Sequence, residues 1–188
     1  MAREVIIHLI RPVHFLNPLE FKRCMAEYQQ RVFSFTAHML GDKAAAADVT
    51  QDVFIKLWEH RERMDQDRMI GWLLRVARNA CIDAMRKRKV RRALSDSEDF
   101  SLDSLPSTGI GPDKEAAASL FRERLAAALD TLGEPHKSIV ILREVQEYKY
   151  EEISEVLSLP LNTVKVYLHR ARKALRQELT EVMRHDYA

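Results

Sequence analysis

The stretch "ISEVLSLPLNTVKVYL", residues 153–168, decides the fold because its spacing matches a helix-turn-helix. That motif needs a small residue in its first helix, a tight turn four residues later and a branched apolar residue six positions further on. Ser154, Ser158 and Val164 stand at these positions. The apolar residues that complete the predicted wedge between the helices are Ile153, Leu157 and Leu168. We therefore predict one helix over 150–157 and another over 162–179.

The turn between these two helices has an unusual residue at its centre. Ser158 stands where glycine is usual, because the backbone there can require a positive φ, which costs serine a modest amount of free energy. Pro160 fixes the turn, since its ring restricts φ. Asn162 or Thr163 is expected to cap the second helix with its side-chain oxygen.

The second helix is basic, which indicates a polyanionic partner. Residues 161–177 hold five Lys or Arg residues and no acid. Lys165, His169 and Arg172 are three or four positions apart and share a face, with Arg170 beside it. In a DNA complex, residues near the helix start would contact base edges and later ones would contact phosphates. An ordinary helical hairpin with a solvated basic face is the alternative, and the segregation of charge argues against it.

The remainder of the chain also has helical periodicity, and only 5 of the 188 residues are glycine. Apolar residues recur at steps of three and four, which predicts an all-α fold. The predicted helices before the motif cover residues 21–40, 44–59, 70–88, 114–132, which Asp113 caps, and 135–146.

One segment interrupts this helical pattern. Residues 93–112 contain "SDSEDFSLDSLPSTGIGP", which is rich in Ser, Asp, Gly and Pro and poor in apolar residues. Such a composition is typical of an extended linker that does not pack. Its acidic residues, called the linker acids below, are Asp96, Glu98, Asp99 and Asp103. We therefore predict two small helical domains joined by a flexible acidic linker.

Several functional classes are disfavoured by the sequence. Cys24 and Cys81 are far apart and form no CxxC pair, so we expect two inert, buried thiols rather than a disulfide or a zinc site. No apolar run reaches the length of a membrane span, and the first residues make a poor signal peptide, so we expect a cytoplasmic protein. We expect no cofactor, metal or catalytic residue, because no Gly-rich phosphate loop, metal cluster or nucleophile elbow is present.

Two blocks of sequence stand in a characteristic order along the chain. The first is "ADVTQDVFIKLWEH" (47–60) followed by "GWLLRVARNACIDAMRKR" (71–88), and the second is "EEISEVLSLPLNTVKVYLHRARKAL" (151–175). The first resembles the promoter-melting domain of bacterial RNA polymerase sigma factors, and the second resembles their last domain. Their order, their spacing and the missing middle domain resemble the extracytoplasmic-function (ECF) group over residues 20–180.

This resemblance implies a domain organisation and a function. Residues 18–92 would form a sigma-two-like helical bundle, 93–112 the acidic linker, and 113–188 a sigma-four-like four-helix domain with the helix-turn-helix. The chain would bind core RNA polymerase and direct initiation through −10 and −35 promoter elements, without catalysis of its own. In relatives the linker threads the RNA-exit path of the polymerase, where an acidic strand can mimic RNA. A linker that only keeps the chain soluble is the alternative.

The resemblance also assigns candidate residues. Those for docking on the clamp helices of the polymerase are Asp48, Gln51, Asp52 and Lys56, although Ala45 and Ala47 replace acids that are common in the family. Those for the −10 non-template strand are Arg75, Asn79, Asp83 and Arg86, with Arg61 and Arg63 in the loop 60–69 that captures a flipped base. Asn79 is the strongest of them, because an amide offers both a donor and an acceptor to a base edge. Trp58 and Trp72 are expected in the core rather than stacked on bases.

For the −35 duplex the candidates are Asn162, Thr163, Lys165, Val166, His169, Arg170 and Lys173. Relatives commonly have Ser-Arg where this chain has Val166 and Tyr167. Val166 can contact a thymine methyl but cannot donate a hydrogen bond, and Tyr167 can pack inward or reach a phosphate. We therefore expect an altered −35 preference rather than a loss of binding.

Other partners and other functions remain open at this point. An anti-sigma factor is the expected regulator, because such proteins are common in the family and cover the same surfaces. A stand-alone helix-turn-helix regulator and a sigma mimic that sequesters an anti-sigma factor are the alternatives. Residues 1–17 lie outside the resemblance and have no assigned role. Their apolar group, Val5, Ile6, Ile7, Leu9 and Ile10, can pack on the first domain, bind a regulator or reflect a start site further downstream.

Overall fold

The computed structural model describes residues 16–64, 68–94 and 123–186, and every element in these ranges is helical. The all-α prediction is therefore confirmed for the described residues. The elements are α1 (Pro18–Leu40), α2 (Lys43–Glu59), the 3-10 turn η1 (Arg61–Arg63), α3 (Met69–Leu94), helical residues 123–131, α5 (His136–Val140), the π-helical turn η3 (Ile141–Val145), α6 (Tyr150–Leu157) and α7 (Leu161–Asp186).

Helices α1 and α2 form an antiparallel hairpin whose ends are set by local sequence. The Asn17 side chain accepts hydrogen bonds from the first-turn amides of α1, and the Glu20 carboxylate accepts one from the Asn17 amide in return. Gly41 ends α1 with a φ of 67°, a left-handed conformation that glycine adopts without strain. Asp42 then caps α2 by accepting from the Ala45 amide.

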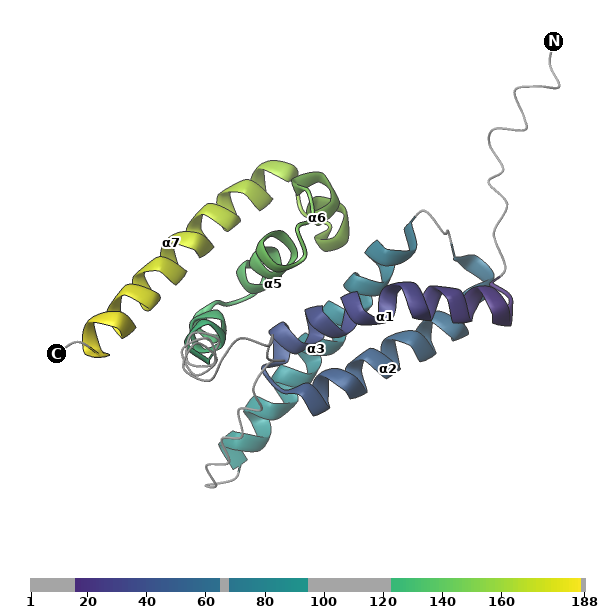
Figure 1. The fold of residues 1–188 in the computed structure, drawn as a ribbon, viewed down its shortest axis with the longest axis horizontal. Coiled ribbons are helices and arrows are strands. Elements are labelled where there is room, and N and C mark those ends of the chain that lie inside the picture. Colours follow the sequence, from purple (N-terminus) through teal and green to yellow (C-terminus); the bar gives the residue numbers. More distant parts are fainter. Residues whose placement is uncertain (1–15, 65–67, 95–122, 187–188) are drawn as a thin grey trace, which may run out of the picture.

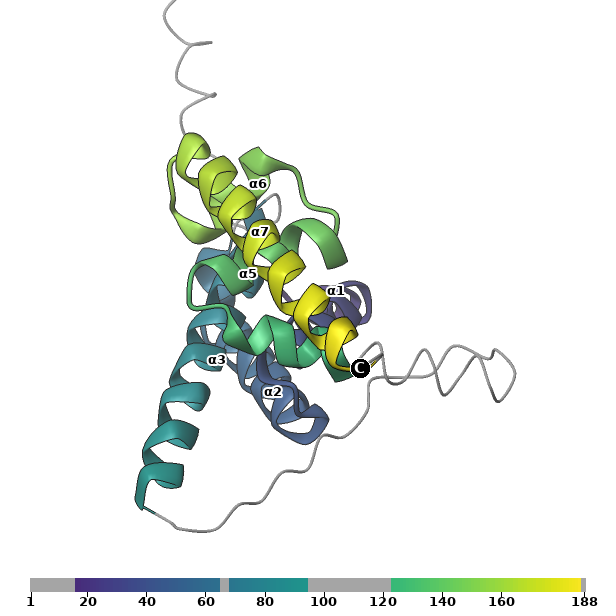
Figure 2. The same cartoon turned by 90° about the vertical axis from the view of Figure 1, so that its left-hand side faces the viewer.

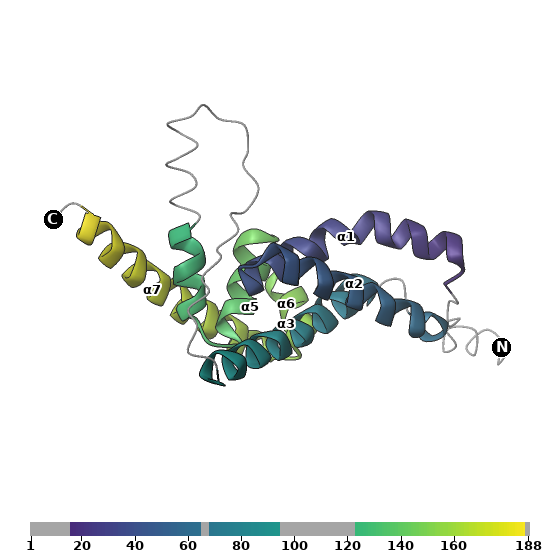
Figure 3. The same cartoon turned by 90° about the horizontal axis from the view of Figure 1, so that it is seen from below.

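Helix α3 packs against both members of this hairpin, and the three helices form an elongated group (Figure 3). Val49, Val53 and Leu57 turn inward from α2, as the spacing of the sequence predicts. Two buried hydroxyls satisfy each other within this core: Thr36 and Thr50 lie 3.1 Å apart, and Thr50 also donates to the Ala46 carbonyl at 2.7 Å. A buried polar pair of this kind is tolerated because its hydrogen bonds are complete.

The C-terminal half contains the helix-turn-helix. Ile153, Val164 and Leu168 are buried between α6 and α7, so the predicted wedge is present. Ser158 takes a φ of 53° and a ψ of 44°, and it therefore occupies the left-handed position that usually selects glycine. The Ser154 hydroxyl donates to the Leu159 carbonyl at 2.5 Å and ties the turn to the first helix.

The two halves pack directly on each other. Helix α6 contacts α3, and η3 contacts α1, so that a single apolar core runs through both halves. Helices α5 and α6 lie between α7 and the three-helix group (Figure 1), and α7 covers the outer face of the C-terminal half (Figure 2). This contact is a feature that the prediction of two linked domains did not include.

Three predictions need correction or lie outside the described residues. Helix α7 begins at Leu161, so Asn162 and Thr163 stand inside its first turn and neither is its cap. Trp58 is 37% exposed, so the prediction that it belongs to the core is wrong, whereas Trp72 is half-buried. The linker 93–112 lies outside the described residues except for its first two positions, as do Asp113 and the first part of the helix predicted over 114–132.

Candidate functional site

The solvent face of α7 carries most of the side chains predicted to contact the −35 duplex. Those that are exposed are Asn162, Lys165, Val166, His169, Arg170 and Lys173, while Thr163 is half-buried. Between them, the buried Val164, Leu168 and Ala171 hold the helix against the rest of the domain. The helix therefore presents a polar and basic surface to solvent while its other side is fixed by packing.

Three side chains of α7 contact other parts of the C-terminal half. Arg172 donates to the Glu144 carboxylate through Nη2 at 2.6 Å and through Nε at 3.0 Å. That pairing raises the pKa of Arg172 and turns this guanidinium toward η3. The Lys165 ammonium lies 6.0 Å from the centre of the Tyr150 ring, and the ring of Tyr167 packs 4.7 Å from that of His136. Tyr167 therefore packs inward, which leaves Val166 as the exposed member of the unusual pair.

The residues predicted to handle the −10 strand lie along α3 but differ in their surroundings. Asn79, Asp83 and Arg86 are exposed, and Arg86 lies 3.5 Å from Asp83 one turn away. Arg75 instead donates from Nη2 to the Glu155 carbonyl at 2.6 Å and from Nε to the Val156 carbonyl at 3.1 Å. In this arrangement its donors face the end of α6, so Arg75 is engaged by the helix-turn-helix half.

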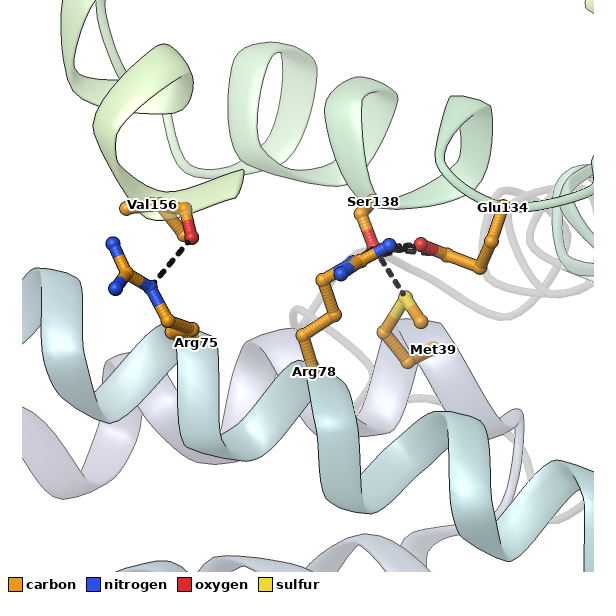
Figure 4. Close-up of polar contacts among 6 residues, drawn as sticks. All are labelled: Met39, Arg75, Arg78, Glu134, Ser138 and Val156. Atoms are coloured by element: carbon orange, nitrogen blue, oxygen red, sulfur yellow. Dashed lines mark hydrogen bonds and ion pairs between the residues drawn. The ribbon is translucent and has the colours of Figure 1, made fainter. Parts of the chain in front are cut away.

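A second arginine of α3 makes a cross-domain contact that the sequence did not predict (Figure 4). The Nε of Arg78 donates to the Glu134 carboxylate at 2.9 Å and to the Ser138 hydroxyl at 3.2 Å, and that hydroxyl lies 2.8 Å from both carboxylate oxygens. Ser138 is fully buried, and the side chains of Arg78 and Glu134 are only about one-fifth exposed, at 20% and 21%. We call Arg75, Arg78, Glu134 and Ser138 the clasp.

A buried lysine reinforces the same interface. Lys137 is 3% exposed, and its ammonium donates to the Met39 carbonyl at 2.7 Å and to the Asp130 carboxylate at 2.6 Å. Met39 belongs to the last turn of α1, where helix carbonyls lack partners within the helix. The charge therefore satisfies an acceptor of one half while it is neutralised by an acid of the other.

The loop after α2 is partly described. The Arg61 guanidinium stacks 4.4 Å from the centre of the Trp58 ring and donates to the Trp58 carbonyl at 2.8 Å. The side chain of Arg63 and residues 65–67 lie outside the described part, so the structure describes the predicted base-capture loop only in part. Trp58 also meets Phe21 edge-on, with ring centres 5.1 Å apart, which places its ring at the boundary of core and solvent.

The predicted docking face lies on α2. Asp48, Gln51, Asp52 and Lys56 are all exposed, and the first three share one face because they are separated by three and four positions. Asp48 and Gln51 also line an apolar groove of about 830 Å³ between α1 and α2, together with Phe54, Ile55 and Trp58. The acid and amide groups therefore stand at the edge of an apolar surface, which suits a protein partner.

Neither cysteine belongs to this surface. Cys24 and Cys81 are buried, and burial raises the pKa of their thiols to about 11 and about 12. Within the described residues, no group of three or more His, Cys, Asp or Glu side chains can hold a metal ion. None of the helices in the described ranges is both long and apolar enough to cross a membrane.

Comparisons with known proteins match both halves of the chain. The family described as "Sigma-70 region 2" matches residues 24–91, and the family described as "Sigma-70, region 4" matches residues 122–175. The ECF RNA polymerase sigma factor SigL of Mycobacterium tuberculosis is 33% identical over 158 residues, which cover 83% of this chain and 86% of SigL. The ECF RNA polymerase sigma factor SigW of Bacillus subtilis is 27% identical over 161 residues, covering 82% of this chain and 86% of SigW.

Solved structures share the arrangement of helices. The sigma factor RpoE of Bartonella quintana, in complex with the anti-sigma factor NepR, aligns with a TM-score of 0.69 and 22% identity over 86% of this chain and 97% of that chain. CnrH, in complex with the cytosolic domain of CnrY, aligns with a TM-score of 0.65 and 23% identity over 88% and 90%. At these identities the likeness concerns the fold.

Proposed function

The chain belongs to the ECF sigma factors of RNA polymerase, and from this premise we propose how its surfaces divide the work of initiation. In this proposal it is a dissociable subunit without catalytic activity that acts with core polymerase in the cytoplasm. Residues 18–92 bind the polymerase and the −10 strand, residues 113–188 bind the −35 duplex, and residues 93–112 connect them. The observation that carries the proposal is the exposed basic face of α7, set on a complete helix-turn-helix in the same chain as the acid and amide face of α2.

Recognition of the −35 element is assigned to the start of α7. Lys165 and Val166 are exposed near the beginning of the helix, where side chains reach base edges in the major groove. Arg170 and Lys173 follow one to two turns later and are placed to bind phosphates. Arg172 is not part of this set, because its Nε and Nη2 already donate to the Glu144 carboxylate.

Recognition of the −10 element is assigned to α3 and the loop before it. Asn79 is exposed and carries both a donor and an acceptor for the edge of a flipped base. Arg75 is placed one turn earlier, but while α6 packs against α3, an arrangement we call closed, it donates to the carbonyls of Glu155 and Val156. Use of Arg75 on DNA therefore requires α6 to move away from α3.

We extend the partner class of a structural neighbour to this chain and propose that an anti-sigma factor restrains it. RpoE of Bartonella quintana was solved with the anti-sigma factor NepR bound, and CnrH was solved with the cytosolic domain of CnrY bound. The contacts between α3 and the C-terminal half support this extension, because an inhibitor that favours them also withholds Arg75 from DNA. The identity of the inhibitor and the signal that releases it lie beyond this proposal.

Run-off transcription tests the proposed function. Core polymerase of the host bacterium is incubated with genomic fragments, with and without the chain, and the 5′ ends of the transcripts are mapped. We expect new start sites that require the chain and share −35 and −10 sequences. The variant Lys165→Ala/Arg170→Ala should lose these starts, whereas Lys149→Ala, which changes an exposed lysine before α6, should keep them. Absence of any chain-dependent start site would reject the proposal.

A further inference from the structure

The groove between α1 and α2 is the least explained surface of the described residues. Its volume is about 830 Å³, and its apolar lining comes from Phe21, Met25, Phe33, Phe54, Ile55 and Trp58. Ile55 is 56% exposed and Trp58 is 37% exposed, so that large apolar side chains lie open to solvent at one end. An exposed apolar surface with a polar rim is typical of an interaction site rather than of an ordinary protein surface.

The chain itself supplies an apolar segment close to that end of the groove. Residues 1–15 lie outside the described residues, and their sequence includes "VIIHLI" at 5–10, in which five of six residues are aliphatic. The described part begins at Leu16, which is 1% exposed and whose amide donates to the Arg61 carbonyl at 3.1 Å. Arg61 in turn stacks on Trp58, so the first described residue is anchored beside the open end of the groove.

We propose that residues 5–10 bind this groove and so cover part of the docking face of α2. The groove is lined by Asp48 and Gln51, which belong to that face, so the same surface cannot hold the segment and the polymerase at once. Residues 1–15 are in this view an internal competitor of the polymerase. The competition rests on the proposed function, whereas the binding of the segment does not.

The dimensions of the chain and of the groove agree. From Phe21 to Phe33, α1 rises about 18 Å at about 1.5 Å per residue. Six residues span about 20 Å when extended, and residues 11–15 add up to about 17 Å of chain between Leu16 and the segment. The extended segment is therefore about as long as the groove.

The charges agree as well. The residues that line the groove include the acid Asp48 and no lysine or arginine, and Asp52 is exposed on the next turn of α2. The apolar segment is flanked by Arg3 and Arg11, with Glu4 as its one acid. Basic residues at both ends of an apolar segment complement an apolar groove with an acidic rim. Residues 5–10 are also joined through the chain to Leu16, which lies beside the groove, whereas a second copy of the chain has no such covalent link.

Tethering makes even weak binding effective. A short linker holds a segment at an effective concentration in the millimolar range, so an intrinsic dissociation constant of about 1 mM fills the groove about half of the time and lowers the apparent affinity for polymerase about twofold. If the segment fills the groove nine-tenths of the time, only one-tenth of the chain can dock, and the apparent affinity falls about tenfold. We therefore expect removal of the segment to tighten polymerase binding by about twofold to tenfold.

Trp58 provides a direct readout of the groove. The chain has two tryptophans, so Trp72→Phe leaves emission from Trp58 alone. In that background, deletion of residues 2–11 and the length-matched variant Ile6→Ser/Leu9→Ser should both shift Trp58 emission to longer wavelength and should tighten binding to core polymerase. In Ile55→Ser, the Ile6→Ser/Leu9→Ser change should have little further effect, because the groove is already weakened. The control background is Val90→Ser, which changes an exposed apolar residue of α3 outside the groove. In that background the Ile6→Ser/Leu9→Ser change should retain its full effect.

The outcomes separate the two proposals. Unchanged Trp58 emission on deletion of the segment would overturn the binding of residues 5–10, and a shift that depends on protein concentration would assign the groove to a second copy instead. A shifted emission with unchanged polymerase affinity would overturn the competition. If no form of the chain binds polymerase, the proposed function fails, while Trp58 emission still decides whether the segment occupies the groove.

Discussion

The clasp between α3 and the C-terminal half should control how readily the two halves separate, and Arg78→Met tests it. The substitution keeps most of the aliphatic volume and removes the guanidinium that donates to Glu134 and Ser138. Ser138 keeps its own hydrogen bond to the carboxylate, so the loss falls on the contact between the halves. We expect a larger open population without unfolding of either half.

The structure sets the size of this effect. A hydrogen bond to a charged group contributes about 1.5–3 kcal/mol when it is well shielded. Arg78 and Glu134 remain 20% and 21% exposed, so solvent screening lowers the contribution to about 1–2 kcal/mol. A change of that size multiplies the ratio of open to closed molecules by about 5 to 30. The double variant Arg75→Met/Arg78→Met should open the chain further, because the contacts with Glu155 and Val156 are then lost too.

Energy transfer between dyes on the two halves measures this ratio. Ala44→Cys on α2 and Gln177→Cys on α7 are exposed attachment points, and the native thiols are buried. The mean transfer efficiency should fall in Arg78→Met and should stay at the wild-type value in Arg86→Met, whose ion pair with Asp83 is exposed and lies within α3. An unchanged efficiency in Arg78→Met, or an equal fall in both variants, would show that the clasp does not hold the two halves together.

Three further predictions concern separate parts of the chain. Val166→Ser should shift the −35 sequence selected from random promoters, because it replaces an exposed methyl contact with a hydroxyl donor, and an identical selected motif would contradict direct readout at this position. Neutralising the four linker acids should weaken polymerase binding or alter the ratio of abortive to run-off RNA, and unchanged products would leave the linker with a solubilising role only. Cys24 and Cys81 should resist alkylation at pH 8, because pKa values of about 11 and about 12 leave about 1 in 1,000 or fewer as thiolate; rapid alkylation of the folded chain would show that they are accessible. Since these pKa values lie above those of the unfolded chain, their contribution to stability is complete below about pH 9 and is lost as the pH rises toward 12.

Local sequence patterns predicted the helices and the helix-turn-helix well. The steps of three and four placed Val49, Val53 and Leu57 inward, and the motif spacing placed Val164 in the wedge. Ser158 was identified as the position with a left-handed backbone because the turn geometry demands it. These features depend on neighbours within a few positions, which a single sequence records.

The sequence did not predict the contacts between the halves. Arg78 meets Glu134 across 56 positions, and Arg75 donates to backbone carbonyls, which carry no side-chain signature. Arg75 and Arg78 look like any other basic residues of α3 until the fold places α6 beside them. The predicted assignment of Arg75 to the −10 strand, which left Arg78 without a role, therefore missed that one face of α3 packs against the C-terminal half.

Trp58 shows why helical periodicity can mislead at the end of a helix. It follows Phe54 by four positions and so belongs to the apolar stripe of α2, which predicts burial. At the last turn of α2, however, the partner helix α1 is only beginning, so Phe21 and Arg61 cover part of the ring and leave 37% of the residue exposed. Periodicity identifies the face of a helix but does not show how far the partner extends along it.

Footprinting on a promoter, with and without core polymerase, tests the central claim that this helix-turn-helix works as part of a polymerase subunit. We expect protection of both the −35 and the −10 elements when core polymerase and the chain are present together, and weak or no protection by the chain alone. Tight protection of the −35 element by the chain alone, unchanged when polymerase is added, would instead identify a stand-alone DNA-binding regulator.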